Sequence, residues 1–184
     1  MDHPSIAERL SGGDRRSLTA IDAVTSDVLR HNDRFGELFD TMLHEDPVVR
    51  ARAAGAVERI TRARPDLLVP FRKRLIAEAG EIEQPDVRRH VAHMLPRVRL
   101  DLKDRSKAIA LLERYLESTE ETVVVAAMSA IGDFAVDDAP LRRRLTPTIE
   151  RLAASRVPAV EARGKSVLGR FASVDAKALI KKRR

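Results

Sequence analysis

The sequence predicts an all-α fold, a right-handed α-α superhelix (α-solenoid) of about four to five helical hairpins. The first observation is an apolar pattern, four positions separated by 4, 4 and 3 residues, that occurs four times. The second is composition: of 184 residues 43% are hydrophobic but only 3% aromatic, so the core must be mainly aliphatic. Gly and Pro are scarce, at 8 and 9 residues, which argues against a turn-rich all-β fold.

The four copies of this pattern, called here the apolar frames, follow one another at offsets of 38, 36 and 37 residues. Their internal spacing puts four side chains on one face of a helix, so each copy predicts one amphipathic helix. The frames are Val49-Ala53-Val57-Ile60, Val87-Val91-Leu95-Val98, Val123-Ala127-Ile131-Phe134 and Val160-Gly164-Leu168-Phe171.

A second amphipathic stretch precedes each frame, so each copy is predicted to be a helical pair. These first helices are expected at residues 35–45, 70–79, 103–117 and 147–154.

Proline supports the predicted helix boundaries, because its missing N–H and fixed φ suit the first turn of a helix. Pro47, Pro85 and Pro158 are expected to begin second helices, and Pro70 and Pro147 to begin first helices. Asp46 is a predicted N-cap. Pro96 lies inside the second frame, so we expect that helix to kink or end there.

The two ends of the chain are expected to depart from the repeat. Residues 14–31 carry Leu18, Ile21, Val24 and Val28 on one helical face, after a break at Gly12-Gly13. We expect a single domain over residues 1–184, with a degenerate cap at 1–32 and repeats at 33–172. A short helix at 174–180 and a basic tail at 181–184 complete it.

Several functional classes are excluded by composition. The absence of Cys excludes disulfides and thiolate metal sites. The apolar stretches are far shorter than the roughly 20 residues that cross a bilayer, so no membrane partner is expected. Residues 1–4, Met-Asp-His-Pro, show no secretory signal, and a cytoplasmic location is expected.

One copy carries a more specific motif. Asp46-Pro47-Val48-Val49-Arg50-Ala51-Arg52-Ala53-Ala54 resembles the second helix of the small bacterial HEAT repeat proteins, and residues 84–92 keep its Val-Arg pair. The resemblance covers residues 33–172 and implies an armadillo-type array of helical pairs. It also implies that Asp46, Arg50 and Arg88 are structural, with Arg50 and Arg88 tying neighbouring repeats together through acidic residues.

Basic residues recur on the flank of the predicted second helices. They form two columns on the first, second and fourth copies: Arg52, His90 and Arg163 in the first column and, seven residues further on, Arg59, Arg97 and Arg170 in the second. The third copy carries Ala126 and Asp133 at these positions. Stacked repeats would align them on the concave surface. The columns can bind phosphates or an acidic partner, or they can form local ion pairs, and we slightly favour ion pairs.

No catalytic residue, cofactor or metal is expected. Gly164-Lys165-Ser166 lacks the remainder of a phosphate-binding loop, and His90 and His93 lack the partners of a zinc site. Asp137 and Asp138 precede Pro140 and are interpreted as a helix cap.

The predicted function is a non-enzymatic protein–protein interaction module that binds a partner, such as an acidic protein, on its concave surface. One alternative is binding of the nucleic-acid backbone through the arginine columns. The chain resembles the DNA-alkylation-repeat glycosylases only in architecture, and it lacks the Trp on which their mechanism relies, so no glycosylase activity is expected. A second alternative is an accessory subunit of a bilin lyase-like system.

Overall fold

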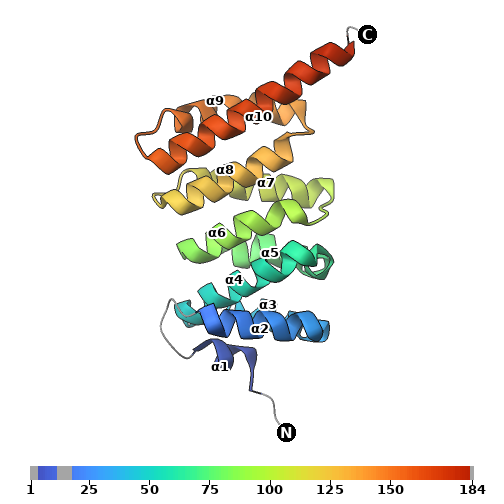
Figure 1. The fold of residues 1–184 in the computed structure, drawn as a ribbon, viewed down its shortest axis with the longest axis vertical. Coiled ribbons are helices and arrows are strands. Elements are labelled where there is room, and N and C mark those ends of the chain that lie inside the picture. Colours follow the sequence, from blue (N-terminus) through green and yellow to red (C-terminus); the bar gives the residue numbers. More distant parts are fainter. Residues whose placement is uncertain (1–3, 12–17, 183–184) are drawn as a thin grey trace. The chain divides into compact units, whose positions relative to one another are not determined.

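The computed structural model describes residues 4–11 and 18–182, and over these residues the chain forms ten α-helices and no strand (Figure 1). The α-helices are α1 (Ile6–Ser11), α2 (Leu18–Arg30), α3 (Phe35–Thr41), α4 (Pro47–Ala63), α5 (Arg72–Ala77), α6 (Pro85–Met94), α7 (Leu102–Leu116), α8 (Glu121–Ala135), α9 (Ala139–Ala153) and α10 (Pro158–Lys182). Short 3₁₀ helices join them at η1 (Asn32–Arg34), η2 (Pro65–Phe71), η3 (Ala79–Glu81) and η4 (Leu95–Arg97).

The chain divides into two compact units, residues 1–107 and 108–184. In the first unit α4 lies centrally and packs against α1, α2, α3 and α6. The second helices α2, α4 and α6 are therefore neighbours in one layer. In the second unit α10 packs on both α8 and α9. The prediction of a single domain stays a prediction.

The second helices form where the apolar frames predict them, in α4, α6, α8 and α10. Every frame position is buried except Phe134 and Leu168, which are half-buried. Burial of this repeated face removes apolar surface from water and so stabilises each helical pair. The all-α prediction is confirmed.

Aromatic side chains fill a cluster of their own in the first unit. The Phe39 and Phe71 rings stack with centroids 4.7 Å apart, and Phe35 meets Phe71 edge-on at 5.6 Å. This cluster joins α3, which precedes α4 in the chain, to η2, which follows α4. It fixes the outer layer against which α4 packs.

Most predicted helix boundaries are confirmed. Asp46 caps α4, since its Oδ1 accepts a hydrogen bond from the Val48 backbone N–H at 2.7 Å. Pro47, Pro85 and Pro158 begin their helices. The helix of the second frame ends at Met94, and Pro96 lies in η4 directly after it.

Two proline predictions were wrong. Asp138 caps α9 by accepting from the Leu141 N–H at 2.9 Å, so the helix begins at Ala139 and contains Pro147 in its interior. Pro70 lies inside η2, and α5 begins only at Arg72. A proline fits the first turn of a helix but does not identify it when a stronger cap lies upstream.

The two ends of the chain also differ from expectation. The sequence did not predict α1, and Gly12-Gly13 lies outside the described residues. Residues 174–180 do not form a separate helix, because α10 continues without interruption to Lys182. Arg142 of α9 supports this continuation, since its Nη2 donates to Asp175 Oδ1 at 2.7 Å.

Candidate binding groove

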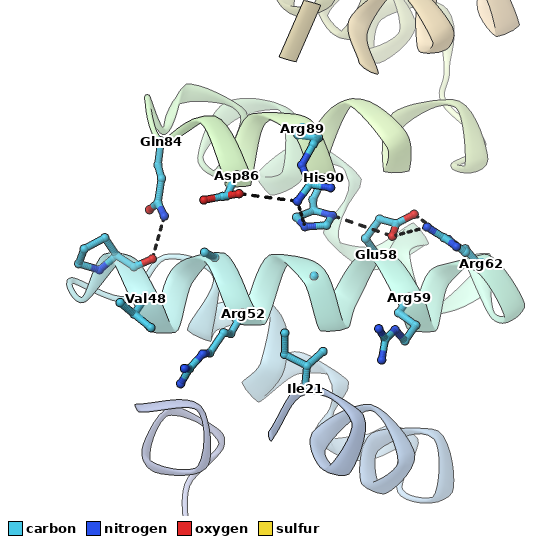
Figure 2. A pocket seen from close by; sticks show the side chains of 13 residues that line it. Ile21, Val48, Arg52, Glu58, Arg59, Arg62, Gln84, Asp86, Arg89 and His90 are labelled. Carbon is cyan, nitrogen blue, oxygen red and sulfur yellow. Dashed lines mark hydrogen bonds and ion pairs between the residues drawn. The ribbon is translucent and has the colours of Figure 1, made fainter. Parts of the chain in front are cut away.

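A hollow of about 710 Å³ lies in the first unit along the layer of second helices. We call it the α2/α4/α6 groove, after the helices that contribute to it (Figure 2). It is lined by Ile21, Pro47, Val48, Ala51, Arg52, Gly55, Glu58, Arg59, Arg62, Gln84, Asp86, Arg89 and His90.

The groove follows from the periodicity of α4. The apolar frame of this helix is buried, and the adjacent face steps through Val48, Ala51, Gly55, Glu58 and Arg62 at three- and four-residue intervals. Small residues form the middle of that face. A Cβ added at Gly55 would lie 3.5 Å from His90 Nε2, so the imidazole of α6 rests directly over this glycine.

Glu58 is the electrostatic centre of the groove wall. Its side chain is only 4% exposed, and it accepts from Arg62 Nε at 3.0 Å and from Arg97 Nη2 at 2.6 Å. Arg97 Nη1 also donates to the Glu58 carbonyl at 3.0 Å. Burial alone would raise the pKa of Glu58, but the hydrogen bonds from Arg62 and Arg97 outweigh it and hold this pKa below its ordinary value.

His90 is neutral at physiological pH. Burial, assisted by the charge of Arg89, lowers the pKa of His90 to about 3. Arg89 Nη2 lies 3.1 Å from His90 Nε2, and an arginine can only donate, so Nε2 accepts and the ring proton lies on Nδ1. His90 therefore positions Arg89 and adds no charge to the groove.

The second predicted column consists of arginines that are paired with carboxylates. Arg59 binds Asp22, Arg97 binds Glu58, and Arg170 binds Asp133 at 2.8 Å. The partners are 37, 39 and 37 residues apart, and in each pair the carboxylate lies on the preceding second helix. We call these three contacts the inter-repeat ion pairs.

The residues of the first predicted column differ in burial and in charge from copy to copy. Arg52 is buried at 2% exposure, and its Nη1 donates to the Leu10 carbonyl of α1 at 2.6 Å. His90 is mostly buried and neutral, as described above. Arg163 is exposed on α10 in the second unit. In the first unit this column is thus not a row of exposed cations.

The predicted structural arginines bind oxygen atoms next to their own helices. Arg50 Nη1 donates to the His44 carbonyl at 2.9 Å, and Arg88 Nε donates to the Ile82 carbonyl at 3.1 Å, six residues back in both cases. Arg50 Nε also donates to Gln84 Oε1 of the next copy at 3.0 Å. For Arg50, the tie between repeats thus runs through an amide oxygen.

Sequence reasoning missed the groove residues Glu58, Arg62, Arg89 and Asp86, and it missed Asp22 beside them. Two signals were present. Glu58 and Arg62 have the i, i+4 spacing of helical ion pairs, and Asp86 and Arg89 have the i, i+3 spacing. Asp22 lies one repeat before Arg59, so the period itself points to it.

The residues that the structure describes contain no group of three or more His, Cys, Asp or Glu side chains arranged to hold a metal ion. None of their helices is long and apolar enough to cross a membrane.

The helical pairs, the layered second helices and the inter-repeat ion pairs define a helical-repeat protein of the α-solenoid class. Residues 6–131 match the family model of the HEAT repeat domain, and the chain belongs to this family. The match includes α1 and α2, which the sequence indicated only as a degenerate cap. No curated protein matches the chain.

Proposed function

We propose that this protein is a non-enzymatic scaffold that recognises another protein in the α2/α4/α6 groove. HEAT repeats form extended surfaces whose usual role is interaction with other proteins, which supports the class of function. The observation that carries the location is the groove itself, a hollow of about 710 Å³ to which α2, α4 and α6 all contribute residues.

The lining of the groove supports a protein ligand. Pro47, Val48, Ala51 and Ile21 offer apolar contact, and the arginines around them offer donors that fix orientation. Arginine is enriched at protein interfaces, where its fork of donors binds carboxylates and carbonyls.

Nucleic-acid binding has weaker support. Its affinity would come from arginines that neutralise phosphates, yet Arg59, Arg97 and Arg170 already donate to carboxylates. Stacking on bases needs exposed aromatic rings, and Phe35, Phe39 and Phe71 contact one another instead.

Site-specific photo-crosslinking tests this function. A photoreactive amino acid replaces Ala51 in the groove, and the matched control replaces Ala77, which is exposed on α5 of the same unit. We expect a defined crosslinked protein from position 51 and none from position 77. The captured protein is then purified and its binding measured directly.

A filling substitution completes the test. Gly55→Ala adds a Cβ at ordinary contact distance from His90 and should keep the fold and the binding, whereas Gly55→Met should occupy the groove and abolish binding. Equal crosslinking from positions 51 and 77, or full binding by Gly55→Met, would overturn the proposal.

A further inference from the structure

Arg59, Arg62 and Arg89 bring exposed guanidinium groups to the α2/α4/α6 groove. Arg59 and Arg62 belong to α4 and Arg89 to α6, and Arg62 is the most accessible at 67% exposure. Figure 2 shows Arg62 on α4 and Arg89 on α6, with Glu58 and His90 between them. Arg62 and Arg89 are thus placed to act together on one ligand.

The charges on this wall do not cancel. Glu58 carries one negative charge and binds two arginines, Arg62 and Arg97. One positive charge is therefore left over at this cluster. The other two groove arginines each have one carboxylate nearby: Arg59 pairs with Asp22, and Arg89 lies 3.7 Å from Asp86 Oδ1. Positive and negative charges are therefore equal in number at these two positions.

Arg62 keeps donors for a ligand. It binds Glu58 through Nε and Nη2, and among the described residues no hydrogen bond involves its Nη1. A guanidinium has five N–H donors in a planar fork, so the outward edge of Arg62 can bind a carboxylate while Glu58 holds the inner edge. Glu58 therefore orients Arg62 and leaves some of its N–H donors available to a ligand.

His90 plays the same supporting part for Arg89. Its buried ring accepts from Arg89 Nη2 at 3.1 Å and stays uncharged, so it holds the guanidinium without competing for an anion. The Arg89–Asp86 contact is long at 3.7 Å and exposed, which makes it weak and replaceable by a better carboxylate.

We propose that the α2/α4/α6 groove binds a short acidic peptide segment of a partner protein, with carboxylates on Arg62 and Arg89 and aliphatic side chains over Val48 and Ala51. This assignment of the ligand rests on the proposed function. Charge complementarity carries it: the groove presents surplus positive charge beside an apolar floor, and an acidic segment with aliphatic residues matches both.

Fluorescence anisotropy tests the ligand class. The probe is a short fluorescein-labelled peptide of glutamate and leucine, compared with the same peptide carrying glutamine for glutamate and with labelled single-stranded DNA. We expect the glutamate peptide alone to bind, with affinity that falls as salt rises. Equal binding of the glutamine peptide, or tighter binding of DNA, would overturn the proposal.

Substitutions locate the binding. The double variant Arg62→Gln/Arg89→Gln should bind the glutamate peptide with an affinity about tenfold lower or more, because each substitution removes a charge-assisted hydrogen bond. Arg143→Gln, an equal change of charge on the exposed side of α9, should leave affinity unchanged. Undiminished affinity in the double variant would place the peptide elsewhere and refute the site.

A second pair of variants leaves every arginine in place. Ala51→Glu puts a negative charge on the groove floor and should repel the glutamate peptide, whereas Ala51→Gln of similar size should bind it. Binding by both variants would refute the groove as the site. If the crosslinked partner from position 51 lacks an acidic segment, the ligand class fails while the proposed function stands; if nothing is crosslinked, the proposed function fails first.

Discussion

Arg170 of α10 donates from Nη2 to Asp133 Oδ1 of α8 at 2.8 Å, across a separation of 37 residues. The same relationship joins Arg59 to Asp22, again 37 residues apart. The pairs are therefore part of the repeat and not accidents of one surface. Their burial differs from copy to copy, however, and this difference determines how much each one contributes to stability.

Removing the carboxylate of the buried pair should destabilise the fold more than removing that of an exposed pair. Glu58→Gln weakens hydrogen bonds to two arginines at a 4% exposed side chain and should lower the free energy of unfolding by about 2 kcal/mol. Asp133→Asn, at a 50% exposed side chain, should lower it by about 0.5 kcal/mol. Urea denaturation of both variants measures the difference, and equal losses would contradict it.

Asp27 should make the first unit sensitive to acid. Hydrogen bonds from Arg9 and His31, with the charges of Arg9 and Arg34, lower the pKa of Asp27 from 3.8 to about 2. Because the folded form holds the ionised carboxylate, this contribution is complete above about pH 4 and is lost as the pH falls towards 2.

Asp27→Asn tests this dependence. The variant should be about 1 kcal/mol less stable near neutral pH, after allowance for solvent screening, and the gap should close towards pH 2. The readout is the unfolding midpoint as a function of pH, with exposed Asp33→Asn as the control. A gap that persists at the acid end would contradict the assignment.

Two glycines of α10 should respond oppositely to the same substitution. A Cβ at Gly164 would lie 2.7 Å from the Ala153 backbone Cα, so Gly164→Ala must push α10 away from α9 and should cost about 1–3 kcal/mol. Gly169 has no heavy atom within 4 Å of an added Cβ, so Gly169→Ala should gain about 0.5–1 kcal/mol from helix propensity. Thermal unfolding measures the change in stability of each variant. If both substitutions stabilised or both destabilised the protein, the result would be inconsistent with this packing.

The cap of α4 should depend on the side-chain acceptor of Asp46. Asp46→Ala removes the oxygen that receives the Val48 N–H at 2.7 Å and should cost about 1 kcal/mol. Asp46→Asn keeps an acceptor and should cost much less. Circular dichroism during urea unfolding compares them, and similar losses from both variants would show that charge rather than capping matters.

The repeat could be predicted from sequence because it depends on the size of the side chains and on the spacing at which apolar residues recur. The 4, 4 and 3 spacing located α4, α6, α8 and α10 without any tertiary information. Pro147 misled because a proline is compatible with both a first turn and a tolerated interior position, and only the cap at Asp138 distinguishes them. A local pattern cannot rank two local signals against each other.

The candidate site was predictable only in part. The period identified Arg59, Arg97 and Arg170 as equivalent positions, and one repeat back from Arg59 and Arg170 it points to Asp22 and Asp133. It does not point to Glu58, which lies 39 residues before Arg97. The burial of Arg52 depends on α1, which the sequence did not reveal, and the neutrality of His90 depends on burial over Gly55. Both are properties of packing between helices, so composition and spacing on one helix do not contain them.

The inter-repeat ion pairs have a polarity: in each, the acid precedes and the arginine follows. A copy such as α4 therefore carries an arginine for the helix before it and a carboxylate for the helix after it. The side of α4 that faces the preceding helix and the side that faces the following helix thus carry opposite charges. Internal duplication of the α4 copy would thus add a unit with an arginine for the helix before it and a carboxylate for the helix after it, so the array could lengthen at this point without redesign of the junction.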